Sequence, residues 1–232
     1  MRWLLIAALL VALAGCGDDD ELVVSAASSL TEPLTTCSGD DVKLAFGGSD
    51  ELAAQIRQGV KPDVYAAANM ELPNELYEEG LLEEPLTFAF NELVIAVPDG
   101  SEITAVGALA RPGVKLAIGA ETVPVGSYTR AALSRLPPEQ ERKILGNVRS
   151  EEPDVKGVVG KLTQGAADAG FVYRTDLVDG LKAVALPQRL QPNVAYGAAA
   201  VKGAGDDARR YLASLNGGAC AEALRAAGFG TP

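Results

Sequence analysis

From residue 22 to the C-terminus, short β-rich runs alternate with stretches of helical period, and this alternation restricts the folds open to the chain. The predicted helices carry apolar residues at i, i+3 and i+4 spacing, as Leu52, Ala53 and Ile56 do. Strands that alternate with helices favour an α/β fold with largely parallel sheets covered on both faces. The strands that we expect are 22–25, 42–46, 63–67, 92–97, 114–118, 169–173, 183–186 and 194–201.

Four predicted helix starts carry residues that leave backbone N–H groups free. Ser29 and Glu32 fit a capping box, and Ser49 stands as a cap before the acids Asp50 and Glu51. The segments 123–128 and 152–155 open two more helices. Ordinary helix capping explains any one of them. However, α/β sheets bind ligands at the carboxyl ends of their strands, and helix starts there offer N–H groups to anions.

Composition excludes several classes of function. The chain contains no histidine, so Ser-His-Asp and Cys-His nucleophile systems and histidine-ligated metal sites are excluded. Its net charge of −11 makes nucleic-acid binding unexpected, because a phosphate backbone needs a basic face. We expect no enzyme. The alternatives are a hydrolase, with Ser29, Ser49 and Tyr173 as nucleophile and acid, and a structural lipoprotein.

The N-terminus has the features of an export signal. Arg2 precedes the apolar run 3–13, which is too short to cross a bilayer core of ~30 Å and suits a signal sequence. Leu13-Ala14-Gly15-Cys16 resembles a bacterial lipobox, which implies removal of residues 1–15, lipidation of Cys16 and an extracytoplasmic, membrane-anchored protein. Residues 16–21 would form an acidic tether. An ordinary secretory peptide with a chance cysteine is the alternative.

Two further cysteines, Cys37 and Cys220, remain in the chain. An even pair in an exported protein is compatible with one disulfide. Two buried free thiols are the alternative, because the sequence does not give the distance between them.

A collinear set of segments resembles the periplasmic molybdate-binding proteins of molybdate ABC transporters, which are type II periplasmic-binding proteins. The set spans nearly the whole chain after the signal sequence. Its segments are 24–31, 46–56, 62–65, 91–98, 116–119, 123–128, 168–176 and 228–229.

The resemblance implies a two-lobe α/β fold of the type II periplasmic-binding-protein class, with a ligand cleft between lobes joined by two crossover strands. Residues 22–98 and 194–232 would form lobe I, and residues 99–193 would form lobe II. The C-terminal helices would then pack on the lobe that holds Cys37. This placement makes a bridge between Cys37 and Cys220 credible.

The resemblance also implies a site that binds a tetrahedral oxyanion through hydroxyl and backbone N–H donors, with no cofactor and no direct metal ligands. The residues that match the family's ligands are Ser29, Ser49, Val125, Val155 and Tyr173. Ser28 could replace Ser29 by a shift of one residue. Asp50 departs from the pattern, since many relatives carry a small neutral residue there. The expected partners of this monomer are an ABC permease and its ATPase.

Hydrogen-bond chemistry fits these residues to molybdate or tungstate. Such a dianion offers acceptors only, so a site made of donors suits it. A donor-only site also disfavours protonated phosphate, whose P–OH group would lack an acceptor. An inward-facing Asp50 could accept that proton, so phosphate remains an alternative ligand. Sulfate is also a tetrahedral dianion, and it remains an alternative because the sequence does not give the cavity size that would exclude it.

Overall fold

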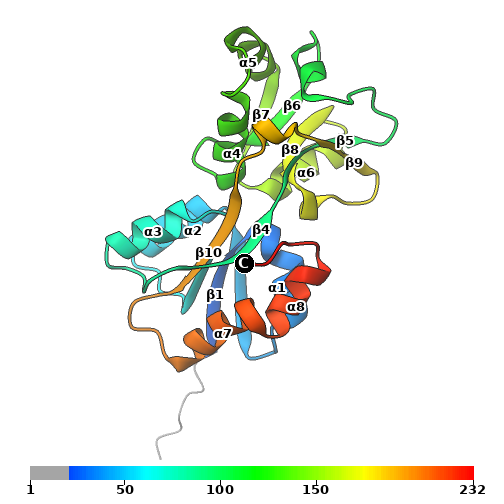
Figure 1. The fold of residues 1–232 in the computed structure, drawn as a ribbon. Helices are drawn as coiled ribbons and strands as arrows, with labels where there is room; N and C mark the ends of the chain where they lie inside the picture. Colours follow the sequence, from blue (N-terminus) through cyan, green and yellow to red (C-terminus); the bar gives the residue numbers. More distant parts are fainter. Residues whose placement is uncertain (1–20) are drawn as a thin grey trace, which may run out of the picture.

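The computed structural model describes residues 21–232, and the chain forms two lobes, each built on a five-stranded sheet (Figure 1). The strand order is β2-β1-β3-β10-β4 in the first lobe and β7-β6-β8-β5-β9 in the second lobe. The predicted signal sequence, Cys16 and the tether up to residue 20 lie outside the described residues.

The strands and helices follow the predicted alternation, and the α/β class is confirmed. The strands are β1 (Leu22–Ala27), β2 (Val42–Gly47), β3 (Val64–Ala67), β4 (Leu86–Asn91), β5 (Leu93–Pro98), β6 (Leu116–Gly119), β7 (Val148–Glu152), β8 (Ala169–Tyr173), β9 (Leu181–Ala185) and β10 (Val194–Ala200). The α-helices are α1 (Thr31–Cys37), α2 (Ser49–Arg57), α3 (Glu71–Glu78), α4 (Pro124–Leu133), α5 (Pro138–Leu145), α6 (Val155–Thr163), α7 (Asp206–Gly217) and α8 (Ala219–Ala226).

Both sheets are mixed, so the expectation of largely parallel sheets is wrong. In the first lobe, β1 is parallel to β2 and β3, whereas β10 is antiparallel to β3 and β4. In the second lobe, β6 is parallel to β7 and β8, whereas β5 is antiparallel to β8 and β9. The reversed strands β5 and β10 follow the passage of the chain from one lobe to the other. Each of these two strands starts at the side of its sheet that faces the other lobe and runs away from that lobe. Their neighbouring strands run toward the other lobe, so the pairing is antiparallel.

The sequence interpretation missed β4 and β7, and this error displaced one lobe boundary. β4 pairs with β10 in the first sheet, and β5 begins after one intervening residue, Glu92, in the second sheet. The first crossing therefore lies before β5 rather than after residue 98. The chain returns through residues 186–193, between β9 and β10.

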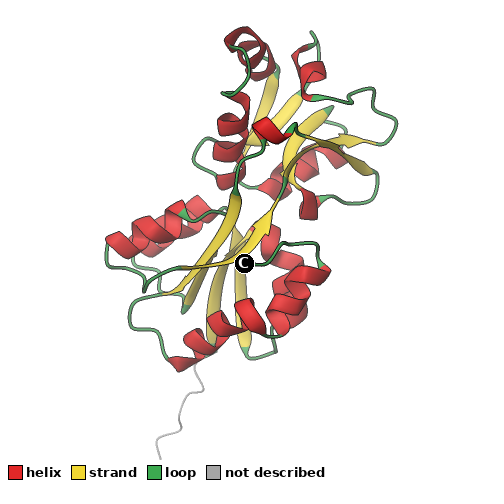
Figure 2. Ribbon diagram, viewed as in Figure 1, coloured by secondary structure: helices red, strands yellow, loops and turns green. Residues whose placement is uncertain are grey.

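Helices flank both sheets (Figure 2). The central strands β3, β8 and β10 are buried along their whole length, as expected for strands covered on both faces. Among the helices of residues 21–232, none combines the length and apolar character needed to cross a membrane.

A disulfide fastens the first lobe. Cys37 at the end of α1 is bonded to Cys220 in α8, with a Cα–Cα distance of 5.0 Å. The bond joins residues 183 positions apart in the sequence. The structure thus places the C-terminal helices on the first lobe.

Candidate functional site

A cavity between the lobes contains all five residues that the sequence singled out. It encloses about 200 Å³ of empty space, including a part open to solvent. Its lining residues include Ser29, Ser49, Val125, Val155 and Tyr173. The first lobe contributes the two serines, and the second lobe contributes the two valines and the tyrosine.

Ser49 is the first residue of α2, but its side chain does not cap that helix. The N-cap position is Gly48, and the Ser49 hydroxyl instead accepts a hydrogen bond from the N–H of Ala68 at 3.1 Å. Since that bond occupies an acceptor position, the hydroxyl hydrogen of Ser49 stays available to the cavity. The expected capping role of Ser49 is therefore wrong.

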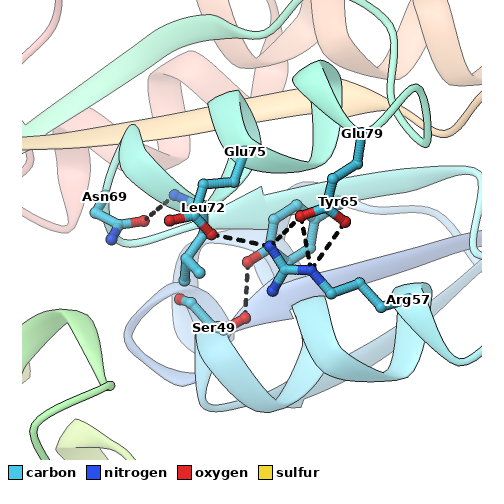
Figure 3. Close-up of polar contacts among 7 residues, drawn as sticks. All are labelled: Ser49, Arg57, Tyr65, Asn69, Leu72, Glu75 and Glu79. Atoms are coloured by element: carbon cyan, nitrogen blue, oxygen red, sulfur yellow. Dashed lines mark hydrogen bonds and ion pairs between the residues drawn. The ribbon is translucent and has the colours of Figure 1, made fainter.

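Contacts at both ends of α2 hold this helix in place (Figure 3). The hydroxyl of the fully buried Tyr65 donates to the Ser49 carbonyl oxygen at 2.7 Å. At the other end of the helix, the Arg57 guanidinium pairs with Glu75 at 2.9 Å and Glu79 at 2.7 Å. These contacts fix α2 against β3 and α3.

Ser29 lies in a 3-10 turn that precedes α1, so the expected capping box with Glu32 is also wrong. The N-cap position of α1 is Leu30, and no side chain caps the helix. The Ser29 Oγ lies 2.9 Å from the Tyr196 hydroxyl on β10. Ser28, the alternative residue, is also buried and also lines the cavity.

Val125 and Val155 supply main-chain donors at the starts of α4 and α6. Val125 follows Pro124 at the first position of α4, and Val155 is the first residue of α6, so neither N–H has an acceptor within its helix. Asp154 caps α6 by accepting from the Gly157 N–H at 2.8 Å. The start of α4 packs closely on the end of β6, so that a Cβ at Gly126 would overlap the Gly119 carbonyl oxygen.

Tyr173 ends β8 with its ring fully buried. Its hydroxyl is buried and has no hydrogen-bond partner among residues 21–232. Burial is the main cause that raises the pKa of Tyr173 well above its ordinary value, so the phenol keeps its hydrogen near neutral pH. A buried hydroxyl without a partner is costly unless a ligand accepts its hydrogen bond.

The lobes touch at the edge of the cavity. The Thr122 hydroxyl of the second lobe donates to the Asp50 carboxylate of the first lobe at 2.6 Å. Gly48 approaches the Pro153 carbonyl oxygen so closely that a Cβ at Gly48 would overlap it. Asp50 is thus engaged between the lobes and is not among the residues lining the cavity.

The cavity presents neutral donors rather than positive side chains. Among the described residues, no lysine or arginine lines it.

Nearby, the buried Asp176 carboxylate pairs with Lys156 at 2.8 Å. Burial raises the pKa of Asp176, and the Lys156 ammonium opposes that shift.

Sequence reasoning missed several lining residues, among them Gly48, Ala68 and Asp154. Asp154 could have been found as an acid placed just before a predicted helix. The role of Ala68, whose N–H orients the Ser49 hydroxyl, carries no sequence signal because any residue supplies the same N–H.

A family model for bacterial extracellular solute-binding proteins matches residues 23–230. The chain belongs to this family. The molybdate-binding protein ModA of Mycobacterium tuberculosis is 32% identical, with the whole of both chains covered.

Two solved structures show the same fold as this solute-binding protein. The periplasmic molybdate-binding protein of Azotobacter vinelandii matches 91% of this chain and 100% of its own with a TM-score of 0.79 and 21% identity. The sulfate-binding protein SubI of Mycobacterium tuberculosis matches 90% of this chain and 85% of its own with a TM-score of 0.78 and 12% identity. The predicted type II periplasmic-binding-protein fold is confirmed.

Proposed function

We propose that this solute-binding protein captures molybdate outside the cytoplasm and delivers it to an ABC importer. The observation that carries the proposal is the Tyr173 hydroxyl. It is buried without a partner in the part of the chain that the structure describes, at the cavity that Ser29, Ser49 and two helix starts also line. Similarity to the molybdate-binding protein of M. tuberculosis over the full chain supports the choice of ligand.

The donor set matches an anion that carries only acceptors. Three hydroxyls and the N–H groups of Val125 and Val155 come from both lobes, so a single tetrahedral ion can be held from opposite sides. Each hydrogen bond to an ionised group contributes ~1.5 to 3 kcal/mol. Helix N-termini add fixed partial positive charge without a buried cation. The negative net charge acts weakly beyond ~8 Å at physiological salt, so capture depends on these local donors.

We propose that the protein also binds tungstate, since tungstate is a tetrahedral dianion with the same acceptor chemistry. Sulfate or phosphate is the alternative. The sulfate-binding protein SubI has the same fold, which keeps sulfate as an alternative ligand. Asp154 is among the residues that line the cavity, which favours phosphate specifically because a carboxylate can accept the hydrogen of a P–OH group.

The remaining parts of the proposal concern location and partners. We infer from the lipobox that Cys16 carries a lipid and holds the protein on the outer face of the cell membrane. The expected partners are the importer's permease and its ATPase, which would receive the ligand from a monomer. No catalytic role is proposed for Ser29, Ser49 or Tyr173.

Molybdate should raise the melting temperature of the protein. A ligand present at 100 times its dissociation constant adds ~2.7 kcal/mol to the free energy of unfolding. Thermal unfolding is measured with molybdate, tungstate, sulfate, phosphate and no anion. An absence of any shift with all four anions would reject the binding function, and a larger shift with sulfate or phosphate would reassign the ligand.

A Ser49→Ala variant should bind molybdate about tenfold or more weakly. It loses one hydrogen bond to an ionised ligand, and ~1.4 kcal/mol corresponds to a factor of ten in affinity. Isothermal titration calorimetry measures the dissociation constant. Ser134→Ala is the matched control, because the Ser134 hydroxyl bonds only to the Ala131 carbonyl of its own helix. Equal affinity of the Ser49 variant and the wild type would remove Ser49 from the site.

A further inference from the structure

The Tyr196 hydroxyl stands behind the candidate site and is linked to it through Ser29. Tyr196 lies on β10 and is fully buried, and its hydroxyl is 2.9 Å from Ser29 Oγ. It is not among the residues lining the cavity. Any effect that it has on a ligand must therefore pass through another residue.

The direction of the hydrogen bonds follows from Asn91, at the end of β4. The Asn91 side-chain oxygen accepts from the Glu92 N–H at 2.9 Å, which fixes the orientation of the amide. Its nitrogen then donates to the Thr175 hydroxyl at 2.8 Å and approaches the Tyr196 hydroxyl at 3.5 Å. An amide nitrogen only donates, so Tyr196 is the acceptor in this contact.

The single hydrogen of Tyr196 is then left for Ser29. Burial raises the pKa of Tyr196 well above its ordinary value, so the phenol stays neutral and retains that hydrogen. Since Ser29 Oγ accepts it, the hydroxyl hydrogen of Ser29 is free to point into the cavity. In the opposite direction, Ser29 would donate to Tyr196 and turn a lone pair toward the anion, which is repulsive.

We propose that Tyr196 is a positioning residue, which together with Asn91 orients the Ser29 hydroxyl as a donor to the bound oxyanion. This hydroxyl chain, made of Asn91, Tyr196 and Ser29, runs from the point where the backbone crosses between the lobes to the ligand cavity. Hydrogen bonds arranged in one direction polarise one another, which strengthens the last donor of the chain. The inference rests on the proposed oxyanion function.

The decisive experiment is a double-mutant cycle read by calorimetry with molybdate. Tyr196→Phe keeps the ring and its edge contacts with Phe88, Tyr173 and Phe229, and it removes only the hydroxyl. We expect this variant and Ser29→Ala each to bind molybdate about tenfold more weakly. We expect the double variant to bind within about twofold of Ser29→Ala, because Tyr196 acts only through that hydroxyl.

A purely structural role of Tyr196 predicts a different result. The two losses would then multiply to about a hundredfold in the double variant, which would overturn the proposal. Unchanged affinity of Tyr196→Phe would overturn it too. Combining Tyr196→Phe with Ser28→Ala tests the neighbouring serine, and we expect those effects to multiply. If coupling appears with Ser28 instead of Ser29, the hydroxyl chain is wrong.

Two further variants test this interpretation. Tyr211→Phe is the matched control, since the Tyr211 hydroxyl on α7 forms a similar pair with Ser38, and its affinity should equal that of the wild type. Asn91→Asp replaces the amide donor of the hydroxyl chain with an acceptor, so that Tyr196 would donate to residue 91 instead of to Ser29. This variant tests the proposal even if Tyr196→Phe does not fold. The added negative charge weakens molybdate binding whether residue 29 is serine or alanine. Only a larger loss of affinity with Ser29 present than with Ser29→Ala supports the reversal of the hydrogen bonds.

The outcome separates this inference from the proposed function. A wild type that binds no molybdate rejects the function, whereas a wild type that binds molybdate without coupling between Tyr196 and Ser29 rejects only the positioning role. Melting curves of every variant are recorded without ligand, and affinities are compared only among variants folded at the assay temperature.

Discussion

A Gly48→Ala variant should fold normally and bind molybdate at least ~100-fold more weakly than the wild type. Gly48 has φ −62° and ψ 134°, a backbone conformation that alanine adopts without strain. The added Cβ would nevertheless overlap the Pro153 carbonyl oxygen, which belongs to the other lobe. The methyl group therefore opposes the approach of the lobes and leaves the fold of each lobe intact.

The size of this effect follows from the division of the donors between the lobes. With the lobes held apart, an anion bound to Ser29 and Ser49 loses contact with Val125, Val155 and Tyr173. Losing two hydrogen bonds to the anion removes at least ~3 kcal/mol of binding free energy, and ~1.4 kcal/mol corresponds to a factor of ten in affinity.

Calorimetry measures the affinity of the Gly48 variant, and X-ray scattering tests the separation of the lobes. We expect the radius of gyration of the wild type to fall when molybdate is added, whereas that of Gly48→Ala stays constant. Gly217→Ala is the matched control, because a Cβ at Gly217, an exposed residue at the end of α7, meets no atom within 4 Å. Wild-type affinity of the Gly48 variant would show that closure at this contact does not contribute to binding.

The sequence predicted the location of the candidate site better than the interactions within it. Ser29, Ser49 and Val155 follow recognisable strand and helix signals, and the structure gathers them at one cavity. Their local roles were misread because the partners are distant in sequence. Ser29 bonds to Tyr196, 167 residues away, and Ser49 accepts from Ala68, 19 residues away, so no local capping pattern contains this information.

The missed strands have different physical causes. β7 consists of Val148, Arg149, Ser150, Glu151 and Glu152, whose polar character reflects its place at a sheet edge, where alternate residues are exposed to solvent. Only one residue separates β4 from β5, and the predicted strand 92–97 corresponds to β5 alone, so the segment before it was not recognised as a separate strand. Their pairing reveals the change of sheet between them, since β4 pairs with β10 whereas β5 pairs with β8 and β9.

Removal of the disulfide should produce the largest loss of stability among the variants considered. A Cys37→Ala/Cys220→Ala double variant should lose ~2 to 5 kcal/mol of the free energy of unfolding. The bond joins residues 183 positions apart, so its loss frees a long loop in the unfolded chain. Alanine is chosen because Cys220 is buried in α8, where a serine hydroxyl would add a separate cost.

Urea unfolding followed by circular dichroism measures the change in the free energy of unfolding for the disulfide variant. Cys37→Ala alone should give nearly the same loss, because breaking the bond from either side frees the same loop. The cavity is lined by neither cysteine, so molybdate affinity should stay within a few fold of the wild type in calorimetry. If the midpoint and slope of urea unfolding equalled those of the wild type, the loop closed by the disulfide would add no stability. A loss of affinity comparable to that of Gly48→Ala would show instead that the bond, through α1, holds Ser29 at the cavity.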